Sequence, residues 1–390
     1  MAGNNAMRQL DWDGARYLAG NTFRRVESES IPLKECHARI LAEDIYASCD
    51  LPFYATSSMD GWAVRGESPW RIVGEVSTGS VPDISLKDSE CMKISTGGAV
   101  PQGATAVIPW ESVRQDADWI SGEIEIGDNI RPVGVECAKG EFLFPVGTRI
   151  APAMVGFLAA TGHDQIEVSK RLRVAIFFLG DELLHEGVPR DGSIRDALGP
   201  VLPSMLENSG AIVTTAHFVK DDLHALNGEI AKVLADVDIV MTTGGTADGP
   251  KDFVKSAIAH LAGRYVIDCV QVRPGYHVLI AAINQGDRTL PFIALPGNPQ
   301  SAIAAFTSFG KPVMTSMLGA PLPELIQVDL QEKFITQHGF SRLIPGNLTG
   351  KTFTPTGFLG SAMLRGVAAA SGFALIAPGG DSARWLPLAG

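Results

Sequence analysis

The hydrophobic pattern of residues 1–171 changes twice along the chain. Residues 11–45 carry two segments with helical spacing, and in the second, 33–45, apolar side chains from Leu33 to Leu41 share one stripe. From about residue 46 to 145, short β-like runs such as RIVGEV (71–76) and ECMKIS (90–95) alternate with Gly, Pro and Asp. The run APAMVGFLAATGH (151–163) then predicts a helix. We infer a β-rich domain, 46–140, inserted into an elongated helical/β linker domain made of residues 1–45 and 141–171.

From residue 172 onward, apolar runs alternate with helical patterns. The run LRVAIFFLG (172–180) is continuously apolar, as expected of a strand that is covered on both faces. The alternation predicts a three-layer α/β domain over 172–319, with a mostly parallel sheet. Its further strands are expected at 211–218, 237–243, 265–272, 277–283 and 289–297, and its helices at 198–210, 223–234, 251–262 and from about 298. Residues 320–390 return to short strands and are predicted to form a C-terminal β-barrel domain.

Length and charge limit the class of protein. A chain of 390 residues is long enough for several domains of roughly 150 residues each. Its apolar fraction of 45% and charged fraction of 19% are typical of folded proteins. The formal net charge is -11 and no run of Lys and Arg is present, which argues against a nucleic-acid partner.

Cysteine usage and hydrophobicity indicate the compartment. The five cysteines are scattered without a C-x-x-C pair, and the eight histidines show no metal-ligand spacing, so reduced thiols are expected. The N-terminal segment has no apolar signal-peptide core, and no stretch reaches the roughly 18 apolar residues that span a bilayer. These features predict a cytoplasmic protein without a membrane partner.

Chemically rich loops follow three predicted strands of the α/β domain. In an open parallel sheet such loops converge at the carboxyl edge, where ligands bind. In the first loop, Gly180 permits a sharp turn, after which Asp181 and Glu182 project toward a ligand. An alternative is that the two acids start a helix or face solvent.

The second loop, MTTGGTADGPKDF (241–253), has the features of an anion site. Gly244 and Gly245 let backbone N–H groups approach an anion, and a helix is expected to begin near Lys251. Asp252 either caps that helix or holds a divalent metal that bridges phosphates.

The third loop, LPGNPQSAIAAF (295–306), places Asn298 and Ser301 at a helix entry. Side-chain oxygens and N–H groups can meet an oxyanion there, although Asn298 is equally well explained as an ordinary N-cap. Arg273, in VRPGYHV (272–278), is one of the few basic groups near these loops.

The order of these motifs is more specific than any one of them. SSMDGWAVRG (57–66) and ISTGGAVPQGATAVIPWE (94–111) are individually turn signals between strands. Together with FPVGTRIAP, GDEL, TTGG and its downstream Asp, RPG, LPGNPQSA and the GS of FLGSAML, they resemble the molybdopterin molybdenumtransferase family, MoeA, which includes the E domain of gephyrin. The resemblance covers nearly the whole chain.

The resemblance implies a fold and an activity. Family members are elongated four-domain subunits whose α/β domain is similar to the MogA fold, and they form homodimers with a cleft shared between subunits. They take adenylylated molybdopterin and molybdate, hydrolyse the AMP link with Mg²⁺ or another divalent cation, and insert molybdenum into the dithiolene. A MogA-type adenylyltransferase and client molybdoenzymes are the further partners that this activity implies.

The resemblance also implies roles for individual residues. Asp60 and Thr96 match catalytic positions of the β-rich domain, which would be presented to the partner subunit's cleft. Glu182 and Asp252 match the catalytic acids around the phosphate and the metal. The remaining matches are cofactor-binding positions. Arg273, Ser301 and Ser361 match positions associated with the molybdate oxyanion, and Arg342 is a looser match of the same kind. Gly244 and Gly245, at the phosphate corner, and Asn298 complete the set.

Four loops depart from the family pattern: two lose a polar group, one gains the negative charge of Asp248, and one has a single cation in place of two. A hydroxyl is replaced at Phe178 and Leu179, an amide is lost at Ala197 and Leu198 after Asp196, a serine gives way to Ala247 and Asp248, and two lysines become Arg273 and Tyr276. His277 restores part of the lost charge or is an ordinary strand residue.

Two main hypotheses follow from this pattern. The first is a catalytically competent, divergent molybdenum-inserting transferase. The second is a weakened paralogue that binds pterin, nucleotide or a client protein as a maturation chaperone or scaffold. An unrelated flavodoxin-like nucleotide binder is a third reading, which would leave the β-rich domains incidental.

Overall fold

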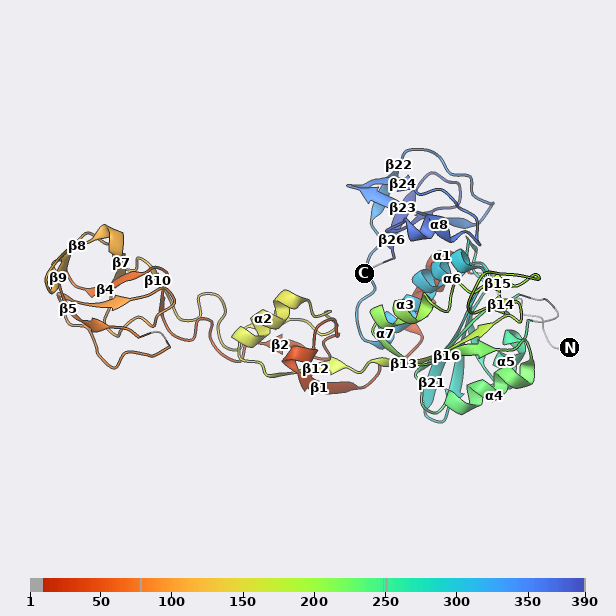
Figure 1. The fold of residues 1–390 in the computed structure, drawn as a ribbon, viewed down its shortest axis with the longest axis horizontal. Coiled ribbons are helices and arrows are strands. Elements are labelled where there is room, and N and C mark those ends of the chain that lie inside the picture. The colour runs from red at the N-terminus through yellow and green to blue at the C-terminus, as the bar shows by residue number, and fades with distance from the viewer. Residues whose placement is uncertain (1–9, 78, 248, 250–251, 389–390) are drawn as a thin grey trace. The chain divides into compact units, whose positions relative to one another are not determined.

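The computed structural model describes residues 10–77, 79–247, 249 and 252–388 (Figure 1). The chain forms two compact units, which are considered separately. Unit 1 contains the residues up to Glu29, 147–149 and the chain from Val168 onward, and unit 2 contains 30–146 and 150–167. The chain passes into unit 2 within β1 (Ser28–Pro32) and leaves it within β12 (Gln165–Ser169).

Unit 1 is built around a six-stranded sheet in the order β16-β13-β17-β21-β20-β18. The first four strands run parallel to their neighbours, and β20 and β18 are antiparallel. The predicted mostly parallel sheet is therefore confirmed. The strands are β13 (Leu172–Leu179), β16 (Ala211–Val219), β17 (Ile239–Thr243), β18 (Arg264–Asp268), β20 (Leu279–Gln285) and β21 (Arg288–Leu295), and a short pair β14 (Leu183–Leu184) and β15 (Ile194–Arg195) lies outside this sheet.

Helices cover both faces of this sheet, which confirms the three-layer α/β arrangement (Figure 1). On one face Ala175, Phe177 and Leu179 of β13 pack against Leu226 and Ile230 of α4 and against α5. The alternate residues Val174, Ile176 and Phe178 are buried as well, so β13 is apolar on both faces from Val174 to Leu179. The helices of the unit are α1 (Trp12–Asn21), α3 (Leu202–Asn208), α4 (Leu223–Val233), α5 (Val254–His260), and the consecutive α6 (Pro299–Ala305), η3 (Phe306–Gly310) and α7 (Lys311–Met317).

Two elements of the α/β domain differ from the prediction. The helix expected from 198 begins only at Leu202, because the Asp196 carboxylate accepts hydrogen bonds from the N–H groups of Leu198 (2.9 Å) and Gly199 (3.0 Å) and holds a turn there. The strand expected over 265–272 is interrupted at Cys269, whose φ is 60°. Beyond the break, β19 (Val272–Arg273) pairs with β23 of a different sheet.

The C-terminal part of unit 1 forms a second six-stranded sheet in the order β19-β23-β24-β22-β26-β25. β23 also pairs with β25, so this sheet closes on itself around a core that includes Ile344, Phe353 and Ala374. Its elements are β22 (Gln327–Leu330), β23 (Ser341–Thr349), β24 (Thr352–Pro355), α8 (Leu364–Ala368), β25 (Gly372–Ile376) and β26 (Ala383–Pro387).

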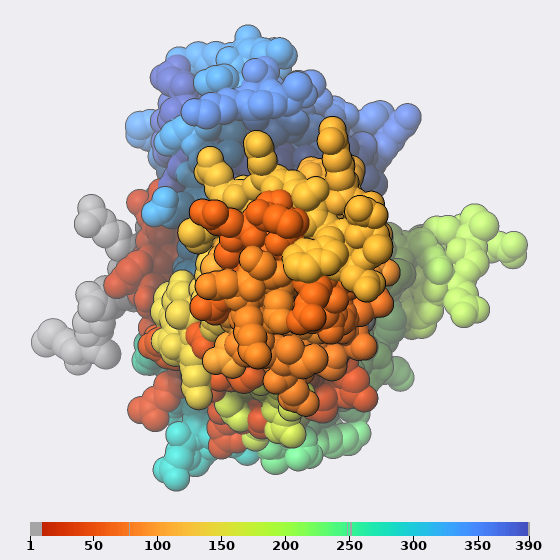
Figure 2. All heavy atoms as spheres, turned by 90° about the vertical axis from the view of Figure 1, so that its left-hand side faces the viewer, coloured from red at the N-terminus to blue at the C-terminus, as the bar shows by residue number. Residues whose placement is uncertain are grey.

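Unit 2 contains a six-stranded sheet in the order β7-β4-β6-β5-β9-β8, with an apolar cluster on each face. Figure 2 shows the close-packed surface of this β-rich module in orange. Gly61 of β4 lies so near β7 that a Cβ there would sit 2.1 Å from the carbonyl oxygen of Ile108. The elements are β4 (Gly61–Arg65), β5 (Trp70–Glu75), β6 (Glu90–Ile94), β7 (Ala106–Pro109), η2 (Trp110–Ser112), β8 (Arg114–Asp116) and β9 (Trp119–Ser121), with the two-stranded pairs β3 (Thr56–Ser57) with β10 (Ile130–Arg131) and β2 (Ile45–Tyr46) with β11 (Phe142–Phe144).

The predicted helix over 33–45 is wrong. Only the short turn η1 (Leu33–Glu35) is helical, and Ala38 has a φ of 62° that an α-helix does not allow. The N–H of Ala38 donates instead to the carbonyl of Ile150 (2.9 Å). Leu33 and Leu41 are buried as the pattern requires, so the apolar spacing identified core positions but not the backbone that carries them.

The helix predicted after the β-rich module is present as α2 (Pro152–Ala160), with Pro152 at its first position. Gly162 follows its end with a φ of 88°. Across the described ranges, no helix combines the length and the apolar character needed to cross a membrane.

Candidate active site

Three loops of unit 1 begin side by side at the carboxyl edge of the sheet. Phe178 at the end of β13 is paired with Thr243 of β17, and Thr243 is paired with Leu295 of β21. The N–H of Gly244 donates to the carbonyl of Leu295 (2.9 Å), so the second and third loops are joined directly. The chemically rich segments therefore meet at the edge where ligands of open α/β sheets bind.

The loop after β17 is shaped by its two glycines. Gly244 and Gly245 have φ values of 82° and 64°, and a Cβ on Gly244 would lie 2.9 Å from the carbonyl oxygen of Leu179. Asp252 closes the far end of the loop, where its Oδ2 accepts the N–H of Gly249 (2.6 Å). Its carboxylate does not cap α5, whose N-cap residue is Phe253. Asp248, one of the departures from the family pattern, and Lys251 lie outside the described residues.

The loop after β13 exposes Glu182. Asp181 is held by a reciprocal pair of hydrogen bonds with Asp221, in which each carboxylate accepts the other residue's N–H at 3.1 Å. Residues 183–184 continue as the strand β14, so the acids do not start a helix. Glu182 is exposed beside this fixed corner, at the edge that also carries Asp252.

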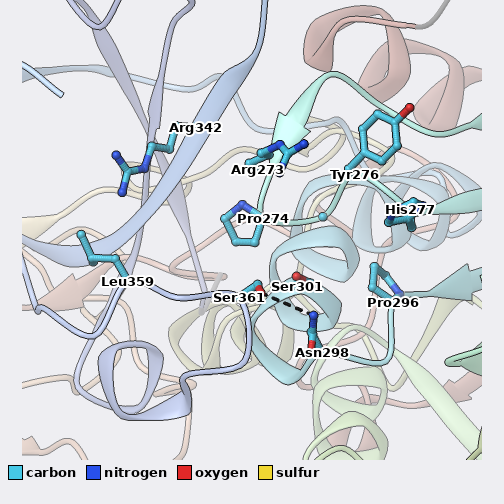
Figure 3. Close-up of a pocket in the computed structure, with 11 residues that line it drawn as sticks. Arg273, Pro274, Tyr276, His277, Pro296, Asn298, Ser301, Arg342, Leu359 and Ser361 are labelled. Carbon is cyan, nitrogen blue, oxygen red and sulfur yellow. Dashed lines mark hydrogen bonds between the residues drawn. The ribbon is translucent and has the colours of Figure 1, made fainter. Parts of the chain in front are cut away.

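A cavity of about 360 Å³ lies next to the third loop (Figure 3). It is formed by β19 and the turn after it, the start of α6, β23, and the loop that precedes α8. Its lining residues are Arg273, Pro274, Gly275, Tyr276, His277, Pro296, Asn298, Ser301, Arg342, Leu359 and Ser361.

Two arginines give the cavity its charge. Arg273 and Arg342 are directly paired residues on the parallel strands β19 and β23. The Arg273 guanidinium lies 5.5 Å from the centre of the Phe340 ring, and Nη1 of Arg342 donates to the carbonyl of Ile335 (3.0 Å). Neither arginine forms an ion pair within the described part of the chain, so their positive charge is available to an anion.

Hydroxyl and amide groups line the opposite part of the cavity. Nδ2 of Asn298 donates to Oγ of Ser361 (3.4 Å; Figure 3). The N–H of Ser301 donates to the carbonyl of Ser361 (3.2 Å). The Asn298 side chain makes no capping hydrogen bond to α6, so the ordinary N-cap explanation is not what the structure shows. These groups offer neutral hydrogen-bond partners to the oxygens of a bound oxyanion.

Tyr276 occupies the position where the family pattern has a second lysine. Its ring lies 4.8 Å from the ring of His277 and 5.8 Å from that of Phe340. The second cation of the cavity is therefore Arg342, which comes from the C-terminal sheet and not from the same loop.

The other departures from the family pattern serve packing. Phe178 is buried and lies 5.3 Å, ring to ring, from Phe218, while Leu179 is also in the core. Leu198, at the position of the lost amide, is buried, and the buried carboxylate of Asp196 accepts the N–H groups of Leu198 and Gly199. In these two loops the side chains at the departing positions lie in the core, and the nearby hydrogen bonds are local.

Asp60 and Thr96 lie in unit 2, on the loops before β4 and after β6. Oδ1 of Asp60 accepts the N–H of Thr96 (2.7 Å), and both residues are exposed. The structure thus brings these two predicted residues together, separately from the nine in unit 1. Of those nine, Arg273, Asn298, Ser301, Arg342 and Ser361 share the cavity, while Glu182, Gly244, Gly245 and Asp252 lie on the adjoining loops.

The acids fit only one kind of metal site. Among the described residues, no group of three or more His, Cys, Asp or Glu side chains is arranged to hold an ion. Mg²⁺ commonly takes one or two carboxylates and completes its shell with water and substrate phosphates. Glu182 and Asp252 offer two carboxylates of this kind, and the described part of the chain forms no cage of protein ligands alone.

Sequence reasoning missed two residues that shape the cavity. Phe340, against which Arg273 and Tyr276 rest, stands in no motif, and its role follows only from the fold. Gln300 stands between Pro299 and Ser301 in the LPGNPQSA segment. A glutamine followed by small and apolar helical residues is the signal that was available.

Comparison with known proteins identifies the family. The family model of the MoeA N-terminal region (domain I and II) matches residues 10–162, and that of a probable molybdopterin binding domain matches 175–316. A molybdopterin molybdenumtransferase of Staphylococcus aureus (strain MSSA476) is 30% identical over 371 residues, covering 90% of this chain and 87% of the relative. The chain belongs to the molybdopterin molybdenumtransferase family.

Further similarities agree with this membership. A molybdopterin molybdenumtransferase of Staphylococcus epidermidis (strain ATCC 12228 / FDA PCI 1200) is 29% identical over 374 residues, covering 91% of this chain and 88% of the relative. The crystal structure of a molybdopterin biosynthesis MoeA protein from Pyrococcus horikosii matches with a TM-score of 0.80 at 25% identity, covering 98% of this chain and 100% of that one. The family resemblance in the motifs is thus confirmed over the chain, while the roles of individual site residues stay predictions.

Proposed function

We propose that this protein transfers molybdenum from molybdate to molybdopterin and releases AMP from adenylylated molybdopterin. Its family membership makes it a transferase enzyme of molybdenum cofactor biosynthesis. The observation that carries the proposed chemistry is the cavity in which Arg273 and Arg342 lie opposite Asn298, Ser301 and Ser361. The alternative of a paralogue without turnover is not favoured by the comparisons.

The cavity is suited to molybdate because of its charge and its donors. Molybdate is a tetrahedral dianion, and its charge is matched by two guanidinium groups that have no carboxylate partner among the residues the structure describes. The hydroxyl groups of Ser301 and Ser361 and the amide of Asn298 would orient its oxygens. In this assignment the arginines supply most of the affinity, and the neutral groups set the orientation.

The loops beside the cavity are assigned to the phosphate and the divalent cation. The N–H groups around Gly244 and Gly245 would approach the phosphate, since no side chain at these positions blocks the backbone. Glu182 and Asp252 would hold Mg²⁺ or another divalent cation. When bound, that cation neutralises phosphate charge and favours hydrolysis of the AMP link.

A homodimer is part of the proposal. Helix α2 supports it. Its residues are apolar, but only Leu158 is fully buried within unit 2, so the rest of the helix leaves apolar surface exposed. An exposed apolar surface of this kind is typical of an interaction site. We assign Asp60 and Thr96 of one protomer to the cavity of its partner, and we place the protein in the cytoplasm, where a MogA-type adenylyltransferase would supply its substrate and molybdoenzymes would receive its product.

The test is AMP release from adenylylated molybdopterin in the presence of molybdate and Mg²⁺. We expect release by the wild type and a loss of at least roughly ten-fold in Asp252→Asn, while Asp287→Asn, an exposed hairpin substitution, stays at the wild-type rate. Folded wild-type protein that releases no AMP in response to molybdate would overturn the proposal and support the scaffold alternative.

A further inference from the structure

Gln300 is a fully buried glutamine near the start of α6. A buried amide is costly unless its polar atoms are hydrogen-bonded. The Gln300 side chain faces two carbonyl oxygens, and with its nitrogen toward them Nε2 donates to Met363 (2.7 Å) and to Gly360 (2.9 Å). Both acceptors belong to the loop that carries Ser361.

This loop has little structure of its own. It connects β24 to α8 without a helix or a strand, and its internal support near Ser361 is the hydrogen bond from the N–H of Met363 to the carbonyl of Gly360 (2.8 Å). Ser361 itself is exposed at its tip. The position of its hydroxyl therefore depends on what fastens the loop to the α/β domain.

The start of α6 fastens the loop at three neighbouring positions. Asn298 donates to the Ser361 hydroxyl, and the Ser301 N–H donates to the Ser361 carbonyl. Both therefore hold Ser361 directly. Gln300 instead donates to carbonyls that precede and follow Ser361, those of Gly360 and Met363. Of the three, Gln300 is the one that does not line the cavity.

We propose that Gln300 is a positioning residue, which clamps the Gly360–Met363 turn onto α6 so that the Ser361 hydroxyl faces the oxyanion cavity. The inference rests on the proposed molybdate site, because the position of the Ser361 hydroxyl affects function only if an oxyanion binds in the cavity. With both of its donor hydrogens, the Gln300 side chain holds the carbonyls that flank Ser361 and Ala362 in this loop.

The first arm of the test measures molybdate binding by calorimetry with the full-length protein. Gln300→Met keeps the volume and removes both donors, and we expect it to weaken molybdate binding roughly ten-fold, with Ser361→Ala causing a similar loss. Because Gln300 acts through Ser361, the double variant should bind about as weakly as Ser361→Ala alone. Losses that multiply in the double variant, or unchanged binding in Gln300→Met, would overturn the proposal. Gln337→Met, an exposed glutamine of the same unit, is the matched control.

The second arm needs no ligand. The Ser301 amide donates to the Ser361 carbonyl, so release of the loop should accelerate hydrogen exchange at the Ser301 amide. We expect this in Gln300→Met and in Gln300→Glu, but not in Gln337→Met. Unchanged protection of Ser301 in both Gln300 variants would refute the clamp. The two proposals can fail separately. If the wild type binds no molybdate but the folded Gln300 variants still exchange the Ser301 amide faster, the clamp is supported and the proposed function is contradicted.

Discussion

The arginine pair of the cavity gives the sharpest prediction. Arg273 and Arg342 are paired residues on neighbouring parallel strands, which lie about 4.8 Å apart, and neither has a carboxylate partner among the described residues. A dianion between them would gain a charged hydrogen bond from each guanidinium. We therefore expect Arg273→Met, Arg342→Met and the double variant to lose molybdate affinity in steps.

The magnitude follows from the exposure of the two side chains. A hydrogen bond to a charged group contributes about 1.5 to 3 kcal/mol. Arg273 is exposed and Arg342 is partly exposed, so solvent screening favours the lower end of that range. Since about 1.4 kcal/mol corresponds to a factor of ten, each single variant should raise the Kd for molybdate roughly ten-fold and the double variant up to roughly a hundred-fold.

Calorimetric titration with molybdate at fixed ionic strength measures these losses. Arg264→Met removes an exposed arginine of β18 and is the matched control, which we expect to bind as the wild type does. Arg273→Lys keeps the charge but loses the planar fork, so it should fall between the wild type and Arg273→Met. If the double variant binds molybdate within roughly two-fold of the wild type, the assignment of this cavity to the oxyanion is wrong.

Three further predictions concern stability and reactivity. Gly244→Ala would place a Cβ 2.9 Å from a carbonyl oxygen at a residue whose φ is 82°. It should lower the melting temperature more than Gly79→Ala, because Gly79 has the same φ but no atom within 4 Å of its Cβ position. Equal shifts in the two variants would contradict this. A hydrogen bond from the Lys87 N–H lowers the pKa of Glu90 below its ordinary 4.5, and such a group stabilises the fold above that pH and loses its effect as the carboxylate protonates. The melting temperature of Glu90→Gln should accordingly lie below that of the wild type at pH 7 and converge with it as the pH falls below 4.5, and a constant difference would count against it. Burial raises the pKa of the Cys91 thiol to about 12, so iodoacetamide at about pH 8 should modify Cys91 in unfolded but not in folded protein, as mass spectrometry of its peptide would report.

Local pattern was sufficient for much of the fold. Every residue of β13 from Val174 to Leu179 is buried between helical layers. Because such a strand must be apolar on both faces, the run 172–180 could be recognised from the sequence. The helix expected at 33–45 failed because apolar residues three and four apart can also be buried by a series of turns. Ala38, with its positive φ and its hydrogen bond to Ile150, breaks the helix through a partner distant in the sequence.

The candidate site divides in the same way. The glycines at 244 and 245 and the acid at 252 could be found from the sequence because a strand, a turn and a helix entry are local signals. The pairing of Arg273 with Arg342 depends on the short strand β19 joining the C-terminal sheet beside β23, and no periodicity in either segment predicts it. Gln300 is hidden for the same reason, since its carbonyl partners at 360 and 363 become neighbours only in the folded chain.

The central claim is that a cavity with two arginines binds molybdate in an enzyme that releases AMP. Its most direct test is the molybdate dependence of AMP release from adenylylated molybdopterin, compared between the wild type and the Arg273→Met/Arg342→Met variant at saturating Mg²⁺. The account predicts that the wild type responds to molybdate and that the variant needs roughly a hundred-fold more of it for the same rate. AMP release with the same molybdate dependence in both proteins, or none in the wild type, would contradict it.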